Sequence, residues 1–435
     1  MVPMKLPAPL RYPPDKVFDR PLRICLLSYR SNPHSGGQGV YVKNLGRALA
    51  DLGHRVEVIT GPPGLQAENG IRVHRLASLD LYNPDDLFRL PSMGELRQPL
   101  NLLEWMGVST MGFPEPFVFG IRAYLQLRQN THRYDIVHDN QSLSYGVWAI
   151  GKMLPVVATI HHPITVDRRL AVRNAASVWK KLKQLRWYSF LHMQKCVSRT
   201  LSKIITVSKS AREDISREFA IPRQRFRIVP NGIDTRCFHP LPGVKRAKNR
   251  IMVTNSADMP LKGLAYLLRA VAELSKTRPV QLVVVGQPKR NGDVESLVRQ
   301  LGIDRRVTFT GRITADELVV QYARAAVAVV PSVYEGFGLP AGEAMACAVP
   351  VISTTGGALP EVVGEAGLLV PPADPTSLGR AIDEVLAHPD RAASMGKTGY
   401  DRVRRLFTWQ RAAQMTLETY RESIVDHARI RTART

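Results

Sequence analysis

The sequence has little cysteine and lacks the short motifs that mark common metal and nucleotide sites. Its 435 residues include four cysteines, none in Cys-x-x-Cys spacing, which disfavours a zinc ribbon, a redox motif and a disulfide framework. Asp-x-Asp does not occur, and neither does the Gly-x-x-x-x-Gly-Lys-Ser/Thr loop that binds nucleoside triphosphates. We therefore expect reduced thiols, a cytoplasmic protein, no bound metal and no cofactor.

Long apolar runs are also missing. No segment reaches the roughly 18 consecutive apolar residues of a membrane-spanning helix. The leader Met1–Arg20 is rich in proline and charge and lacks the apolar core of a secretory signal. We expect the mature protein to begin near its start codon.

Acidic residues are scarce relative to basic ones. The formal net charge of +23 predicts attraction to a polyanion, which can be nucleic acid, an anionic membrane or a phosphorylated ligand. The segment Arg168–Arg212 holds twelve Lys or Arg and no acid. Within it, the residues from Lys180 to Tyr188 fit a helix lying on anionic headgroups and a solvated basic helix face equally well. Peripheral attachment to the inner face of the membrane is thus one alternative, and we expect no nucleic-acid partner.

The chain length and the order of its apolar runs predict two α/β domains. A single core stops growing at about 250–300 residues. Short apolar runs alternate with helical patterns on both sides of a Pro/Gly/basic stretch at Pro240–Arg250, which is typical of two parallel-sheet domains joined by a linker. The expected strands are Arg23–Ser28, Arg55–Thr60, Asp135–His138, Val156–Ile160 and Lys203–Ser208, then Ile251–Thr254, Val280–Val285, Val307–Phe309, Val327–Val330 and Val349–Ile352.

The predicted boundaries follow from these runs. We place a Pro-rich leader at 1–20, a first Rossmann-like domain at 21–235, and a second at 236–407. A final helix occupies 408–435, with Thr408 as its cap. It either stays on the second domain or packs back on the first.

A glycine-rich segment, Ser35-Gly-Gly-Gln-Gly39, follows the first strand and predicts a tight loop before a helix that ends at Gly53. Strand, loop, helix and strand together make a βαβ unit. NAD binding is disfavoured, because Val42 stands where the dinucleotide fingerprint has its third small residue, and the second strand ends in Thr60 rather than an acid.

The most specific motif is Glu335-Gly-Phe-Gly-Leu-Pro-Ala-Gly-Glu343, in which two carboxylates flank a glycine-rich segment. Pro340 suits the first turn of a helix, because its missing N–H would have no partner there. The amides just before it would then point from a helix N-terminus at the end of a strand, where phosphate oxygens bind. Glu343, just inside the helix, is placed to accept hydrogen bonds from the two vicinal hydroxyls of a ribose.

These residues give the chain a resemblance to the retaining glycosyltransferases of family 4. That family shares the GT-B fold of two Rossmann-like domains facing a central cleft, and its Glu-x(7)-Glu element matches Glu335 and Glu343. The resemblance implies that the first domain, 21–235, binds the acceptor and that the second, 236–407, binds the nucleotide-sugar donor. The resemblance covers nearly the whole chain and implies that Glu343 holds the donor ribose while Glu335 lies against the donor sugar. Its other pieces are Ser35–Gly39, Thr159–His161, Val229–Asp234, Pro260–Gly263, Thr310–Arg312 and Pro331–Gly338. The donor-binding residues that it indicates are Gly37, Arg312, Gly336, Phe337, Gly338, Leu339 and Glu343.

The resemblance makes Lys262 the cation that neutralises the departing diphosphate. Most family members carry an Arg five or six residues before this lysine, where this chain has Ala257 and Ser256. Either another cation substitutes, or leaving-group stabilisation depends on Lys262 and helix-terminal amides, or the donor preference differs from the usual one.

The first domain is expected to complete the site. By resemblance, the backbone of Gly37 and Gly39 approaches the donor diphosphate and the acceptor, and His161 contacts the donor sugar near its reacting carbon. Asp139 and Asn140 end another strand; together with Gly39 they line the acceptor side, or with their neighbours they form a satisfied hydrogen-bonding cluster. The expected catalytic residues are Lys262, Glu335 and His161.

The expected reaction moves a hexosyl group from a nucleoside-diphosphate sugar to a hydroxyl of a glycan, a lipid or a small molecule, without a metal ion. Retention of the anomeric configuration is implied by the resemblance. A GT-B epimerase or phosphorylase and a non-catalytic protein that binds polyanions are the alternatives.

Overall fold

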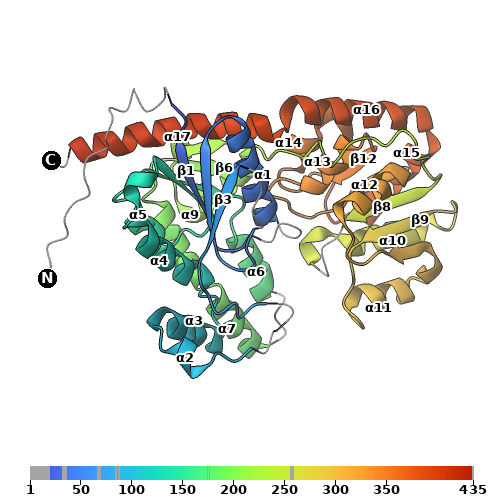
Figure 1. The fold of residues 1–435 in the computed structure, drawn as a ribbon. Helices are drawn as coiled ribbons and strands as arrows, with labels where there is room; N and C mark the ends of the chain where they lie inside the picture. Colours follow the sequence, from blue (N-terminus) through green and yellow to red (C-terminus); the bar gives the residue numbers. More distant parts are fainter. Residues whose placement is uncertain are drawn as a thin grey trace. The chain divides into compact units, whose positions relative to one another are not determined.

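The computed structural model describes residues 20–31, 37–65, 70–83, 86, 89–173, 175, 177–254 and 259–433. The chain divides into two compact units, each built on one sheet (Figure 1). The first unit comprises Met1–Val207, Arg212–Val229 and Ala412–Thr435, and the second comprises Ser208–Ala211 and Pro230–Arg411. The first unit is therefore made from both ends of the chain.

The first unit holds a seven-stranded sheet in the order β3-β2-β1-β4-β5-β6-β7, and all neighbouring strands are parallel. Successive strands are added outward from β1 on one side and from β4 on the other, so the strand order reverses between β1 and β4. The strands are β1 Arg23–Ser28, β2 Arg55–Thr60, β3 Ile71–Arg75, β4 Ile136–Asn140, β5 Val156–Ile160, β6 Ile204–Thr206 and β7 Phe226–Ile228.

The helices of the first unit form because their apolar residues recur at helical spacing. Tyr41, Leu45 and Leu49 are buried on one face of α1, which contacts the first three strands. Gly53 follows this helix with φ +87°, a left-handed conformation that glycine adopts without a Cβ clash. The helices are α1 Gly37–Asp51, α2 Met93–Leu96, α3 Pro99–Ser109, α4 Glu115–Leu127, α5 Tyr145–Ile150, α6 Thr165–Arg173, α7 Val178–Trp187, α8 Phe190–Ser198, α9 Lys209–Phe219 and α17 Trp409–Thr432.

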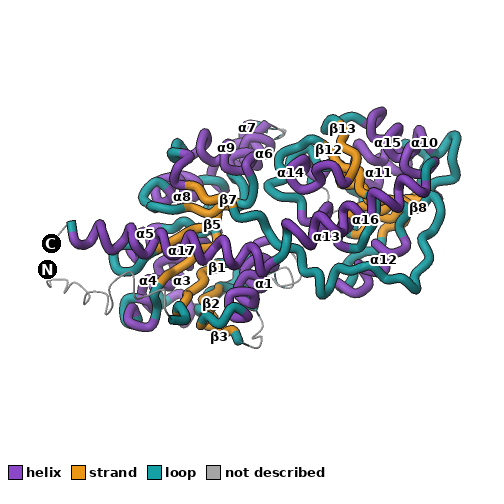
Figure 2. The backbone as a smooth tube through the Cα atoms, turned by 90° about the horizontal axis from the view of Figure 1, so that it is seen from above, coloured by secondary structure: helices purple, strands orange, loops and turns teal. Residues whose placement is uncertain are grey.

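The second unit holds a six-stranded parallel sheet in the order β10-β9-β8-β11-β12-β13, so its strand order reverses between β8 and β11. Helices surround the strands of this sheet (Figure 2). The strands are β8 Arg250–Thr254, β9 Gln281–Val285, β10 Val307–Phe309, β11 Val327–Val330, β12 Val351–Thr354 and β13 Gly367–Val370. The helices are α10 Leu264–Leu274, α11 Asp293–Gln300, α12 Ala315–Arg324, α13 Leu339–Ala346, α14 Leu359–Val363, α15 Pro375–Ala387 and α16 Pro389–Leu406.

Alternate residues of these strands are buried on opposite faces of the sheet. Ile251 and Val253 of β8 join one core cluster with buried side chains of α10, α11 and α15, whereas Met252 between them is buried on the other face. Helices α12, α13 and α16 contact the strands as well. A parallel sheet covered on both faces explains why its strands are continuous apolar runs.

All ten strands predicted from the sequence are present, with ends within two residues of those expected. Three strands, β3, β7 and β13, were not predicted, and all three lie at an edge of their sheet. Each has only one buried residue. Charged residues interrupt β3 and β7, whereas β13 is a short apolar run that was overlooked.

The glycine loop expected at Ser35–Gly39 is wrong for Gly37, Gln38 and Gly39. Gly37, Gln38 and Gly39 belong to the first turn of α1, so the helix starts earlier than predicted. Ser35 and Gly36 lie outside the described residues, as does the leader up to residue 19.

The last helix, α17, joins the first unit from Ala412 onward (Figure 1). Arg411 N donates to Thr408 Oγ1 at 3.2 Å, which confirms the predicted cap. Tyr420 is fully buried, with its hydroxyl 2.6 Å from His138 Nδ1 in β4, and Ser423 Oγ donates to Val156 O at 3.3 Å. Among the described residues, no helix is long and apolar enough to cross a membrane.

Tyr420→Phe tests this packing. The substitution removes one hydroxyl from a buried pair and leaves His138 Nδ1 without its partner. A buried polar group that loses its partner costs about 1–3 kcal/mol, so the first unit should unfold at a lower urea concentration. Tyr124→Phe is the control, because no hydrogen bond of the Tyr124 hydroxyl occurs among the described residues. Equal midpoints for both variants would contradict the packing role of Tyr420.

Candidate functional site

In the second unit, Lys262 and Glu335 form an ion pair where the strand order reverses. Lys262 follows β8, Glu335 follows β11, and these strands are paired in the sheet. Lys262 Nζ lies 2.7 Å from Glu335 Oε1, and Ser332 Oγ donates to the same oxygen at 2.8 Å. The Glu335 side chain is 11% exposed and that of Lys262 is 27% exposed. Ligands of open α/β sheets bind at this kind of reversal, outside the carboxyl ends of the strands.

Glycines allow the backbone segments that carry this pair to approach closely. Gly263 has φ +68°, and a Cβ there would lie 2.0 Å from Pro331 O. Gly357 has φ +64°, and a Cβ there would lie 2.2 Å from Glu335 O, which also accepts a hydrogen bond from Ala358 N at 2.9 Å. The backbone at both places leaves no room for a side chain. Close packing of the main chain at these two glycines therefore fixes the positions of Lys262 and Glu335.

The glycine-rich segment after Glu335 leads into α13 as the sequence predicts. Gly338 is the N-cap residue with φ +98°, Leu339 begins the helix, and Pro340 lies in its first turn. The Phe337 ring is 5% exposed and packs edge-on against Phe407, with ring centroids 5.6 Å apart.

The carbonyl group of Gly336 accepts a hydrogen bond from Ser208 Oγ at 2.8 Å. The N–H groups of Gly336 to Leu339 are not used by the helix, whereas Pro340 has no N–H and Ala341 N donates to Gly338 O at 3.1 Å. Donors of this kind at a helix N-terminus suit phosphate oxygens.

Glu343 lies farther into α13 than predicted. It is the fifth helical residue, beyond the first turn, and its carboxyl is not held by the helix N-terminus. The Tyr322 hydroxyl is 3.4 Å from Glu343 Oε2. Burial raises the pKa of Glu343 to about 7, and this hydrogen bond offsets only part of the rise. A carboxyl with spare acceptor capacity in such a place can bind neighbouring hydroxyls of a ligand.

Two expected contributions to the donor site are not joined to this cluster. Arg312 is exposed, it follows the edge strand β10, and no hydrogen bond or ion pair connects it with another described residue. Strand β10 is separated from β8 by β9. Ser256 and Ala257, which replace the usual arginine, lie outside the described residues.

In the first unit, His161 lies beside the corresponding reversal between β1 and β4. It follows β5, and its Nε2 is 2.8 Å from Asn140 Oδ1 at the end of β4. Asn140 Nδ2 donates to Gln38 O in the first turn of α1 at 3.2 Å, which leaves Oδ1 as the acceptor and assigns the His161 proton to Nε2. Gly37 and Gly39 flank Gln38 in this turn. A Cβ at Gly37 would meet no atom within 4 Å, whereas Gly39 is buried.

A network of buried side chains packs against His161. The Tyr41 ring meets the His161 ring edge-on, with centroids 4.7 Å apart, and the Tyr41 hydroxyl is 2.9 Å from Thr159 Oγ1. Thr159 Oγ1 is 2.7 Å from His138 Nε2, which links the network to Tyr420. Burial lowers the pKa of both His138 and His161 to about 3, so the whole network is uncharged near neutral pH.

The Asp139 carboxylate is occupied within its own loop. Ser142 Oγ donates to Oδ1 and Leu143 N donates to Oδ2 at 2.8 Å. The side chain is fully buried, and this burial raises the pKa of Asp139 to about 6. These contacts hold a turn that contains two left-handed residues, Gln141 at φ +57° and Leu143 at φ +46°. The geometry favours the structural alternative for Asp139, whereas Asn140 contacts His161.

Several residues of these clusters were not identified from the sequence. Ser332 and Tyr322 in the second unit, and Tyr41 and Thr159 in the first, contact the predicted side chains through tertiary structure. Ser332 lies three residues before Glu335 in the same motif, which is the one local signal that could have found it.

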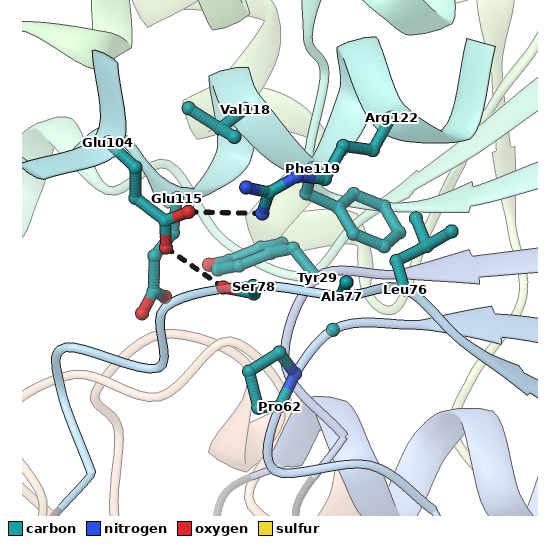
Figure 3. Close-up of a pocket in the computed structure, with 11 residues that line it drawn as sticks. Tyr29, Pro62, Leu76, Ala77, Ser78, Glu104, Glu115, Val118, Phe119 and Arg122 are labelled. Atoms are coloured by element: carbon teal, nitrogen blue, oxygen red, sulfur yellow. Dashed lines mark hydrogen bonds and ion pairs between the residues drawn. The ribbon is translucent and has the colours of Figure 1, made fainter. Parts of the chain in front are cut away.

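A small cavity in the first unit lies among the segments that follow β1, β2 and β3. The Glu104 carboxylate points between Ser78 and Arg122, with Ser78 Oγ 2.8 Å and Arg122 Nη1 3.0 Å away (Figure 3). The cavity volume is about 20 Å³, against roughly 300–1,000 Å³ for a typical ligand pocket. It has room for about one water molecule, so it is not a sugar site. Among the described residues, no cluster of three or more His, Cys, Asp and Glu could hold a metal ion.

Comparisons with known proteins agree with this two-part architecture. A family model described as Glycosyltransferase Family 4 matches residues 35–236, and one described as Glycosyl transferases group 1 matches residues 248–388. The chain is 44% identical to an MMP alpha-(1->4)-mannosyltransferase of Mycolicibacterium hassiacum, across 93% of this chain and 98% of that protein. It is 29% identical to a D-inositol 3-phosphate glycosyltransferase of Kineococcus radiotolerans, across 93% and 96%. The structure of sucrose-phosphate synthase from Thermosynechococcus elongatus matches with a TM-score of 0.69 and 28% identity, across 92% and 98%.

The raised pKa of Glu343 gives a pH-dependent prediction. An acid whose pKa is higher in the folded than in the unfolded protein contributes stability below its unfolded pKa, and this contribution is lost as the pH rises through the folded value. With a pKa raised from 4.5 to about 7, ionised Glu343 should destabilise the fold by at most about 3 kcal/mol at pH 8 and by less than about 1 kcal/mol at pH 5.

Glu343→Gln stays neutral and should therefore raise the melting temperature clearly at pH 8 and only slightly at pH 5. Thermal unfolding at both pH values measures the difference. Glu273→Gln, at an exposed carboxylate of the same unit, is the control and should show no such pH dependence. A gain for Glu343→Gln that is equal at the two pH values would contradict the assignment.

Proposed function

We propose that this chain, which belongs to the glycosyltransferases of family 4 and has their GT-B fold, transfers a mannosyl group from a nucleoside-diphosphate sugar to a carbohydrate hydroxyl. The ion pair of Lys262 with Glu335 beside the start of α13 carries this proposal. The identity of the sugar is supported by the 44% identity with an alpha-(1->4)-mannosyltransferase. Alpha linkage to another sugar is the corresponding proposal for the product.

The second unit, in this proposal, binds the donor nucleotide. The N–H groups of Gly336 to Leu339, which precede the first hydrogen bond of α13, donate to the diphosphate oxygens, and the Glu343 carboxyl accepts hydrogen bonds from the ribose hydroxyls. Lys262 has an exposed fraction of 27%, so its ammonium can reach a second anion while it keeps its contact with Glu335.

The chemical step requires stabilisation of negative charge on the leaving group. As the bond between the anomeric carbon and the phosphate oxygen breaks, its electron pair stays on the diphosphate. Lys262 and the helix-terminal amides are preorganised donors for that charge. They supply the stabilisation that a divalent cation supplies elsewhere, so we propose that transfer does not require a metal ion.

Retention of configuration is part of the same proposal. The acceptor oxygen forms its bond to the anomeric carbon on the face that the diphosphate leaves, and the acceptor proton passes to the departing phosphate oxygen. No enzymic nucleophile is needed in this scheme. Glu335 lies against the donor sugar and holds Lys262 in place.

The first unit, in this proposal, binds the acceptor and contributes His161. Because the pKa of His161 is lowered to about 3 by burial, its imidazole is neutral and is not a general acid at neutral pH. With its Nε2–H directed at Asn140, the ring is held in one orientation as a neutral hydrogen-bonding group for sugar hydroxyls.

A donor panel tests the proposed reaction. The purified protein is incubated with mannose and glucose conjugates of guanosine and uridine diphosphate, in the presence of a chelator, with an oligomannoside acceptor. We expect an elongated product from a mannose conjugate, with an α linkage by NMR. Release of a free sugar phosphate or an epimerised donor, with no elongated product, would reject glycosyl transfer in favour of a phosphorylase or an epimerase.

Variants of the ion pair test the assigned roles. Lys262→Ala should lower kcat by about 10²–10³, the usual cost of removing one donor that stabilises transition-state charge. Glu335→Gln should also lower kcat strongly, because the ammonium loses its carboxylate partner. Lys276→Ala removes an ammonium from an exposed Lys–Glu pair of the same unit and should leave kcat unchanged. Near-normal kcat for Lys262→Ala, with wild-type folding by circular dichroism, would reject the role of Lys262.

A further inference from the structure

Helix α7 directs its apolar residues outward. Val178, Leu182 and Leu185 recur at spacings of four and three residues, so they share one face, and Trp179 lies beside them. Their exposed fractions are 74% for Val178, 64% for Trp179, 52% for Leu182 and 48% for Leu185. The apolar stripe of an ordinary surface helix faces the core of the protein. Burial within the first unit does not account for this stripe.

The opposite face of α7 is anchored to the first unit by aromatic contacts. The Trp187 ring stacks on Phe113, with centroids 5.1 Å apart, and meets Tyr82 edge-on at 5.5 Å. Arg186 Nη2 donates to Thr110 Oγ1, which follows α3, at 2.8 Å. The outward stripe is therefore presented by a helix that is held in place.

Basic side chains accompany the stripe. By helical spacing, Lys181 and Lys183 flank the stripe on its two sides, whereas Lys180 lies on the opposite face. All three are exposed, and none has a carboxylate partner among the described residues. The wider segment Arg168–Arg212 has no acidic residue at all. Apolar residues flanked by lysines on one exposed helix match the chemistry of an anionic bilayer surface, where the apolar side chains enter the headgroup region and the ammonium groups contact phosphates.

Further apolar side chains are exposed on the short helices at the same end of the first unit. Figure 1 shows α2, α3 and α7 at this end of the first unit. Met93 of α2 is 80% exposed, and Met106 of α3 is 55% exposed.

We propose that the outward face of α7, formed by Val178, Trp179, Leu182 and Leu185 with the flanking lysines, binds the surface of an anionic lipid bilayer. This inference is independent of the proposed transfer reaction, because α7 carries none of the residues assigned to the donor or to His161. It predicts that the first unit works at a membrane surface, where a lipid-linked acceptor would be available.

Vesicle co-sedimentation tests the proposal with the full-length protein. We expect binding to phosphatidylglycerol vesicles at low salt, at least tenfold weaker binding to phosphatidylcholine vesicles, and loss of binding in high salt. Lys181→Gln/Lys183→Gln should weaken binding to the anionic vesicles at least tenfold, because each lysine near an anionic surface contributes to attraction. Lys245→Gln/Lys248→Gln, at two exposed lysines of the second unit, is the matched control and should bind normally.

Tryptophan fluorescence separates insertion of the stripe from simple charge attraction. Vesicles should shift the emission of the wild-type protein to shorter wavelength, and Trp179→Phe should lose most of that shift while it still sediments with the vesicles. Trp179→Ser/Leu182→Ser should lose both. Far-UV circular dichroism and the melting temperature should match those of the wild type in all of these variants, which shows that they are folded.

Three outcomes would overturn the proposal. One is absence of binding to anionic vesicles at low salt. Another is binding that the α7 variants leave unchanged. The third is a salt-dependent complex with duplex DNA or a stable dimer in solution, lost in the α7 variants, with no vesicle binding; the same face would then serve nucleic acid or a second copy of the chain.

Discussion

The second unit depends on an ion pair between the partly buried Lys262 ammonium and the largely buried Glu335 carboxylate, at the carboxyl end of its sheet. Leaving either charge alone in that place would cost several kcal/mol, and the 2.7 Å contact between Lys262 and Glu335 offsets this cost. The pairing depends on strand order, because β8 and β11 are distant in sequence and adjacent in the sheet. It also depends on Gly263 and Gly357, where the main chain approaches its neighbours too closely for any side chain. The start of α13 and the Glu343 carboxyl are arranged around this fixed point.

The two units carry different chemical groups near the reversal of strand order in their sheets. In the second unit, the residues near the reversal of strand order are charged, and Glu343 is held where its ionisation is unfavourable. In the first unit, the two histidines near the reversal are neutral, since burial lowers the pKa values of His138 and His161 far below the physiological range. The Lys262 ammonium fits a diphosphate, and an uncharged hydrogen-bonding network fits the hydroxyl groups of a sugar. This division is consistent with donor binding in one unit and acceptor binding in the other.

Local sequence carries the central strands and the main motif but not the tertiary contacts. The apolar runs of β1, β5 and β11 are continuous because both faces of each strand are buried, and this makes them visible. The edge strand β3 has one buried residue in five and gives no such signal. The motif from Glu335 to Glu343 predicts the start of α13 because Gly338 and Pro340 act locally. Sequence gives no means of finding that Tyr322 contacts Glu343, or that Arg312 follows an edge strand away from Lys262.

Assembly of the first unit from both chain ends has a consequence for biosynthesis. Its last component, α17, supplies the Tyr420 hydroxyl to His138 and Ser423 to β5, and it emerges from the ribosome only after the whole second unit has been made. The second unit, in contrast, is complete in sequence once Arg411 has been added. Domains usually fold in order from the N-terminus during translation. Here, part of one face of the nascent N-terminal sheet stays uncovered until α17 has been synthesised. Chaperone capture during that interval, and premature termination directly after Arg411, should affect the first unit more than the second.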